Sequence, residues 1–157
     1  MPMDINELVE AIDTLNAPDA FKGGFNMLQW QTIEGYLIPF EMKADEVLIE
    51  QGETDRVCYF VGKGSLQVYV SGGPPGGSRI AILRAGAIVG EPSLFGDSPR
   101  MASVSTLTPC TLWALSSQRF EEFAHRVPAL AIEFLRAAGV VMAARMRATL
   151  ARQIPFT

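Results

Sequence analysis

Few residues in this sequence are suited to hold a metal or to act as a catalytic nucleophile or base. The chain has two cysteines, Cys58 and Cys110, and a single histidine, His125. These three side chains cannot complete a four-ligand zinc or iron–sulfur site without carboxylate help. Both cysteines lie in apolar runs typical of buried residues, and His125 ends a helical stretch where a solvated imidazole is expected. We therefore predict no metal, no cofactor and no enzymatic activity.

Long hydrophobic runs and an excess of basic charge are also lacking. The longest apolar run, residues 137–144, is far shorter than the roughly 20 residues of a membrane-spanning helix. The acidic N-terminus does not have the basic, apolar and small-residue order of a signal peptide. Lys and Arg number 13 against 17 Asp and Glu, and the net charge of −4 argues against nonspecific binding to nucleic acid. We expect a cytoplasmic protein without a membrane span and without bound DNA.

The composition that remains is that of a single globular domain, with 48% hydrophobic and 19% charged residues. Periodicity divides the chain into three regions. Residues 1–35 contain apolar residues at helical spacing, beginning with Ile5, Leu8 and Val9, and form a predicted N-terminal helical segment. Residues 36–116 consist of short β runs, and residues 117–153 return to a helical period.

The middle region predicts an antiparallel β fold. Several runs alternate apolar and polar residues, and glycines fall between them where turns are needed. The runs are 46–50, 57–62, 65–70, 79–83, 102–107 and 110–115. A Gly/Pro-rich stretch at 71–78 is expected to form a hairpin tip. Many short strands at this spacing favour a jelly-roll β-roll, so the predicted class is mainly β with flanking helices.

The C-terminal region predicts a helix pair. Ser116 and Ser117 are typical N-cap residues, and Pro128 separates a first helix from a second over 129–152. The second helix has small and apolar residues three or four apart at Leu135, Ala138 and Met142. We interpret this stripe as a candidate surface for a homodimer.

One segment, residues 88–104, combines features suited to an anionic ligand that also carries hydroxyls. A β run ends at Val89, Pro92 to Phe95 can form one helical turn, and Arg100 follows a second turn. The start of a short helix presents unpaired N–H groups, and a guanidinium is suited to phosphate oxygens. Glu91 is a potential acceptor for paired hydroxyls. The alternative is that Arg100 and Glu91 pair with each other in a domain that binds nothing.

This segment resembles the phosphate-binding cassette of the cyclic nucleotide-binding domain family. The likeness covers residues 36–152 and is strongest in Gly90-Glu91, Ser93-Leu94, Pro99-Arg100 and 102–104. The resemblance implies that Arg100 holds the exocyclic phosphate oxygens and Glu91 the ribose 2′-hydroxyl. It further implies backbone donors and apolar walls around the ligand, with Ser103 nearby. The implied donors are Gly90, Ser93, Leu94 and Met101, and the implied walls are Val61, Leu83, Val89 and Val104.

Two positions depart from the family pattern. Pro92 replaces the bulky apolar residue that usually follows the glutamate, and Met101 stands where a Thr or Ser commonly favours cyclic GMP. By resemblance, the ligand is therefore cyclic AMP, with cyclic GMP and cyclic di-GMP left open. Phe60, Phe95 and Trp113 are expected in the core rather than stacked on a base.

These observations favour a receptor module that signals by repacking its C-terminal helices or through an effector protein. The sequence stops at Thr157, so we expect none of the helix-turn-helix domains that bacterial relatives append. An alternative is a ligand-free β-roll scaffold for protein assembly. A haem or redox sensor on the same fold is poorly supplied with ligands.

Overall fold

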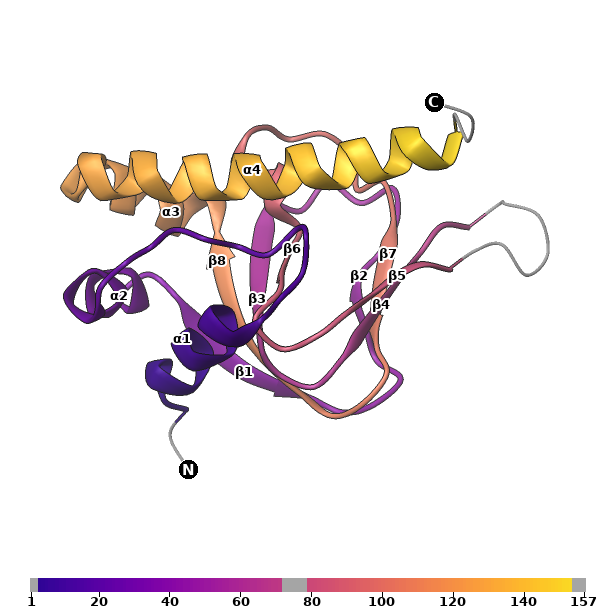
Figure 1. The fold of residues 1–157 in the computed structure, drawn as a ribbon, viewed down its shortest axis with the longest axis horizontal. Helices are drawn as coiled ribbons and strands as arrows, with labels where there is room; N and C mark the ends of the chain where they lie inside the picture. Colours follow the sequence, from indigo (N-terminus) through magenta and orange to yellow (C-terminus); the bar gives the residue numbers. More distant parts are fainter. Residues whose placement is uncertain (1–2, 72–78, 154–157) are drawn as a thin grey trace.

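The computed structural model describes residues 3–71 and 79–153, so most of the predicted hairpin tip at 71–78 lies outside the described residues. The described part is a jelly-roll β-roll with flanking helices (Figure 1). The strands are β1 (Ile38–Met42), β2 (Val47–Ile49), β3 (Val57–Lys63), β4 (Leu66–Tyr69), β5 (Arg79–Leu83), β6 (Ile88–Val89), β7 (Ser103–Thr106) and β8 (Cys110–Ser116). The helices are α1 (Ile5–Thr14), α2 (Met27–Glu34), the short 3-10 helix η1 (Glu91–Leu94), α3 (Ser117–Arg126) and α4 (Pro128–Gln153).

The strands form two antiparallel sheets, in the orders β1-β8-β3-β6 and β2-β7-β4-β5. The first sheet is covered on both faces, by helices on one side and by the second sheet on the other. Phe60 therefore packs in a cluster shared with the helices, while its neighbour Val61 packs between the sheets. This double burial explains why β3 and β8 are nearly continuous apolar runs rather than alternating ones.

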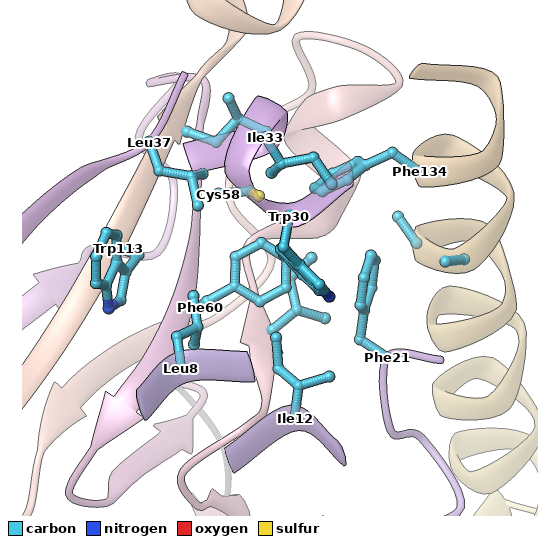
Figure 2. Close-up of a cluster of buried hydrophobic side chains, with 14 of the residues drawn as sticks. Leu8, Ile12, Phe21, Trp30, Ile33, Leu37, Cys58, Phe60, Trp113 and Phe134 are labelled. Atoms are coloured by element: carbon cyan, nitrogen blue, oxygen red, sulfur yellow. The ribbon is translucent and has the colours of Figure 1, made fainter. Parts of the chain in front are cut away.

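The helices attach to the first sheet through an aromatic cluster (Figure 2). Phe134 of α4 lies 5.2 Å from Phe21 and 5.9 Å from Phe60, measured between ring centroids. Phe21 meets Phe60 edge-on at 5.1 Å, and Trp30 of α2 completes the group. These tilted and edge-to-face pairs add to the hydrophobic gain of burying four large rings. The cluster thus joins β3, α2, α4 and the loop that precedes α2.

Side-chain caps mark the starts of three helices, and the cap at Ser116 was predicted from the sequence. Asp4 accepts a hydrogen bond from the amide of Asn6 at the start of α1, and Ser116 does the same for Arg119 in α3. Asn26 and Gln29 form a reciprocal capping box on α2. Pro128 separates α3 from α4 and is itself the first residue of α4, where its missing N–H costs nothing.

Two expectations need correction. Strand β1 was not predicted, because Pro39 interrupts its run; the strand pairs only with β8, so it is an edge strand where proline is tolerated. The predicted dimer face of α4 points into the protein's own body: Ala138 is fully buried, Leu135 packs against the core, and Met142 lines a cavity. This stripe is therefore largely occupied by contacts within the chain, with Leu135 and Met142 half-buried. Within residues 3–71 and 79–153, none of the helices has the length and hydrophobicity that a membrane span requires.

Candidate functional site

A cavity of about 680 Å³ lies between the second sheet, the segment 88–104 and the C-terminal half of α4. The segment 88–104 is called the cassette below. Strand residues such as Leu83 and Val104 form an apolar wall, and the cassette contributes its polar groups. Met142, Arg145 and Thr149 of α4 close another side, and Pro18 and Asp19 reach it from the loop between α1 and α2. Four distant parts of the chain therefore meet around one space.

Within the cassette, Gly90 follows β6 and has a left-handed backbone conformation, with φ 77°. A Cβ there would lie 2.8 Å from Nη1 of Arg100 and 2.9 Å from the carbonyl oxygen of Val57. Both contacts are closer than real Cβ atoms approach other heavy atoms, so only glycine fits. The short helix η1 follows at once, with Pro92 in its first turn as predicted.

Arg100 is buried and extends along the base of the cassette. Its Nε and Nη2 donate to the two carboxylate oxygens of Asp55 at 3.2 and 2.7 Å. Nη2 also donates to the carbonyl of Val57, and Nη1 donates to the carbonyl of Gly90 at 3.3 Å. An arginine has five N–H groups, so one on Nη1 has no acceptor in the described part of the chain. Arg100 lines the cavity.

The hydrogen bonds from Arg100 lower the pKa of the Asp55 carboxyl below its ordinary value, against a smaller opposing effect of burial. Asp55 therefore stays ionised at neutral pH and keeps the guanidinium in place. Because the folded-state pKa is lowered, the stability that this pair contributes is present above the ordinary carboxyl pKa. It is lost as the pH falls through the lowered value.

Glu91 is the second buried charge of the site, with 4% of its surface exposed. Its partner is Arg145 of α4, whose Nη1 donates to both carboxylate oxygens at 2.9 and 2.8 Å. Arg100 and Glu91 thus have separate counter-ions. The interpretation in which they pair with each other is wrong, because Asp55 and Arg145 take those places.

The other predicted site residues fall into two groups. Leu83, Val89, Gly90, Ser93, Met101 and Val104 line the cavity. Ser93 is bound within its own turn, since both its amide and its hydroxyl donate to the carbonyl of Gly90. Val61 and Leu94 pack in the two cores instead. Residues 102 and 104 line the cavity, so Ser103 between them faces away from it. The Ser103 hydroxyl instead accepts a hydrogen bond from the amide of Gln51.

Sequence reasoning did not identify Asp55, and it did not name Arg145 as the partner of Glu91. Phe95 was expected in the core but is 49% exposed and lines the cavity. The sequence contains only a weak indication that Arg145 belongs to the site. This charged residue directly follows the apolar run 137–144, on a helix that is expected to pack against the rest of the protein. No group of three potential metal ligands occurs among the described residues.

Alanine at Gly90 is expected to lower the free energy of unfolding by about 1–3 kcal/mol and to weaken ligand binding, because the new Cβ displaces Arg100. Gly24 is a matched control: it also has a positive φ, 67°, but a Cβ there meets nothing within 4 Å. Chemical denaturation and ligand titration of both variants make the comparison. Equal effects of the two substitutions would contradict the packing role of Gly90.

Comparison with known proteins gives the site a family context. The profile of the cyclic nucleotide-binding domain matches residues 39–127. A cAMP-dependent protein kinase regulatory subunit from Colletotrichum trifolii is 34% identical over 124 residues, 73% of this chain and 31% of the relative. The chain therefore spans about a third of that relative's length.

Solved structures agree on the fold. A cyclic nucleotide-binding domain from Methylobacillus flagellatus KT superposes with a TM-score of 0.81 at 23% identity, covering 98% of this chain and 84% of the other. The catabolite activator protein of Thermus thermophilus gives 0.69 at 24% identity, covering 83% and 60%. The profile match spans more than half of the sequence and includes both Arg100 and Glu91. The chain belongs to the cyclic nucleotide-binding domain family.

Proposed function

We propose that this chain is a receptor module that binds a cyclic nucleotide, cyclic AMP foremost, in the cavity beside the cassette. The observation that carries the proposal is the pair of buried charges on one cavity, each held by its own counter-ion. Arg100 keeps one N–H without an acceptor among the described residues, and Glu91 lines the same space. A ligand with one negative charge and neighbouring hydroxyls matches both groups.

In this proposal the free N–H of Arg100 and the cassette amides of Gly90 and Met101 bind the cyclic phosphate. Leu94, also implied by the family resemblance, packs in the core and does not line the cavity, so it is left out. The amide of Ser93, implied by the family resemblance, is already used within the turn and is left out. Glu91 accepts from the ribose 2′-hydroxyl. The purine then lies against the apolar strand wall and α4.

Cyclic AMP is placed first for two reasons. Met101 offers no hydroxyl for a guanine amino group, and the Colletotrichum relative is named as cAMP-dependent. Matched relatives also include cGMP-dependent protein kinases, at 23–32% identity, so cyclic GMP is tested beside it.

The proposed output is a change in the packing of α3 and α4, read by an effector protein. A ligand moves a conformational equilibrium only if it binds the two states differently. Contacts with Glu91 and Arg145 would supply that difference, because Arg145 lies on α4. We propose a regulatory role rather than an enzymatic one, in keeping with the regulatory relatives. A reducing, cytoplasmic setting is supported by the two free, buried cysteines.

Thermal unfolding with cyclic AMP, cyclic GMP and cyclic di-GMP tests the proposal. A ligand at 100 times its dissociation constant should stabilise the fold by about 2.7 kcal/mol. We expect the largest stabilisation with cyclic AMP, confirmed by calorimetric titration. No shift with any of the three nucleotides would refute the receptor and leave the scaffold for protein assembly.

A further inference from the structure

Asp19 is a charged residue at the cavity that lies outside the segment matched by the family profile. It belongs to the loop between α1 and α2, and its Oδ2 lies 2.9 Å from Nε of Arg145. Together with Pro18 it brings the N-terminal part of the chain to the wall of the site. The contact joins residues 126 positions apart in the sequence.

Arg145 is held from three directions by three parts of the fold. Nε donates to Asp19, Nη2 donates to the carbonyl of Ile88 at 2.7 Å, and Nη1 donates to both oxygens of Glu91. A guanidinium is planar, so fixing two of its nitrogens fixes the direction of the third. The position of Nη1 over Glu91 therefore depends on the bonds at Nε and Nη2.

The orientation of the Glu91 carboxylate matters because the residue is buried, with 4% of its surface exposed. A buried carboxylate needs a cation, and Arg145 is the cation that contacts it. A carboxylate offers about four acceptor positions, and Nη1 uses one on each oxygen. The remaining positions can accept from ligand hydroxyls at the cavity. If Arg145 were held less firmly, the Glu91 carboxylate could rotate, and its hydrogen bonds with the ligand hydroxyls would weaken.

We propose that Asp19 is a positioning residue for ribose recognition, acting through Arg145 on Glu91. The inference rests on the proposed function and adds to it a contribution of the N-terminal loop to the selectivity of the site. Asp19 does not need to touch the ligand. It fixes the Arg145 guanidinium, which in turn orients the Glu91 carboxylate. The loop before α2 thereby contributes to ligand binding in the pocket.

The test compares the full chain with D19N against cyclic AMP and 2′-deoxy cyclic AMP by calorimetric titration. Asp19 and Arg145 are partly exposed, at 31% and 26%, so the expected effect is moderate. We expect the Kd for cyclic AMP to rise about three- to fivefold, and the Kd for the deoxy analogue to change less than about twofold. D19A should give the same pattern. D13N is the matched control, because Asp13 is exposed and no hydrogen bond or ion pair from it appears among the described residues.

A double-mutant cycle separates action through Arg145 from direct contact. R145Q alone should weaken cyclic AMP binding more than about tenfold, because it leaves Glu91 without its cation. In that background D19N should add less than about twofold. Independent effects of the two substitutions, or equal losses for both nucleotides in D19N, would overturn the positioning role. So would tighter binding in D19N.

Failure of this inference is distinguishable from failure of the proposed function. A wild-type chain that binds neither nucleotide refutes the receptor and the role of Asp19 with it. A wild-type chain that binds cyclic AMP while D19N behaves like wild type refutes only the role of Asp19. Thermal midpoints without ligand should match between D19N and D13N to within a few degrees, which shows that both variants are folded.

Discussion

Alanine at Arg100 is expected to weaken cyclic AMP binding by about 2–5 kcal/mol, the loss typical when a buried charge is deprived of its partner. The guanidinium lines the cavity and keeps one N–H without an acceptor among the described residues, and it also shapes the cassette through Asp55, Val57 and Gly90. Its removal takes away the proposed phosphate donor and leaves three acceptors without their donor. Calorimetric titration of the variant with cyclic AMP measures the loss.

Two further variants make this result interpretable. Arg84 is exposed and has no side-chain partner among the described residues, so R84A removes one positive charge without breaking a side-chain contact and should bind normally. R100K keeps the charge but loses the planar guanidinium that bonds to Asp55 and to two carbonyls at once. Its affinity for cyclic AMP should therefore lie between those of R100A and the wild type. A folded R100A with unchanged affinity would remove the phosphate role from this residue.

Alanine at Phe134 is expected to lower the free energy of unfolding by about 3–5 kcal/mol. The ring is fully buried and lies within 6.5 Å, centroid to centroid, of five other aromatic rings. Its loss leaves a cavity where α4 meets β3 and the loop before α2 (Figure 2). Since α4 also carries Arg145, ligand affinity should fall as well. Denaturant titration monitored by tryptophan fluorescence gives the stability.

Ile132 provides the control on the same helix. It is 50% exposed, so I132A should change the stability by about 0.5 kcal/mol or less. The loss in F134A should appear as a shift of the midpoint with little change in the slope of the transition. Similar values for the two variants would mean that the aromatic cluster does not anchor α4.

Local sequence was sufficient for the elements whose causes are local. The cap at Ser116 identified the start of α3, and the caps at Asp4 and Asn26, which were not predicted, likewise lie directly before their helices. The cassette was predictable because a glycine, a helical turn and an arginine lie close together along the chain. The apolar runs of β3 and β8 identified strands, although periodicity alone does not say that both of their faces are buried.

The rest of the site depends on contacts between distant segments. Arg100 and Asp55 are 45 residues apart, and Arg145 and Glu91 are 54 apart. Nothing near Asp55 distinguishes it from a solvated loop residue until the roll brings it beside the guanidinium. Phe95 was misjudged for a similar reason: large aromatic residues are usually buried, but this one ends η1 at the edge of the cavity.

Because the loop before α2 and helix α4 both line the pocket, the choice of fragment boundaries for expression affects the binding site. A fragment limited to residues 39–127 keeps Arg100, Asp55 and Glu91 but discards both Asp19 and Arg145. In such a fragment the glutamate loses its cation and the cavity loses the wall that α4 provides. Affinities measured on this fragment would reflect an incomplete binding site. Fragments made for binding assays or crystallisation should therefore begin before α1 and end beyond Thr149.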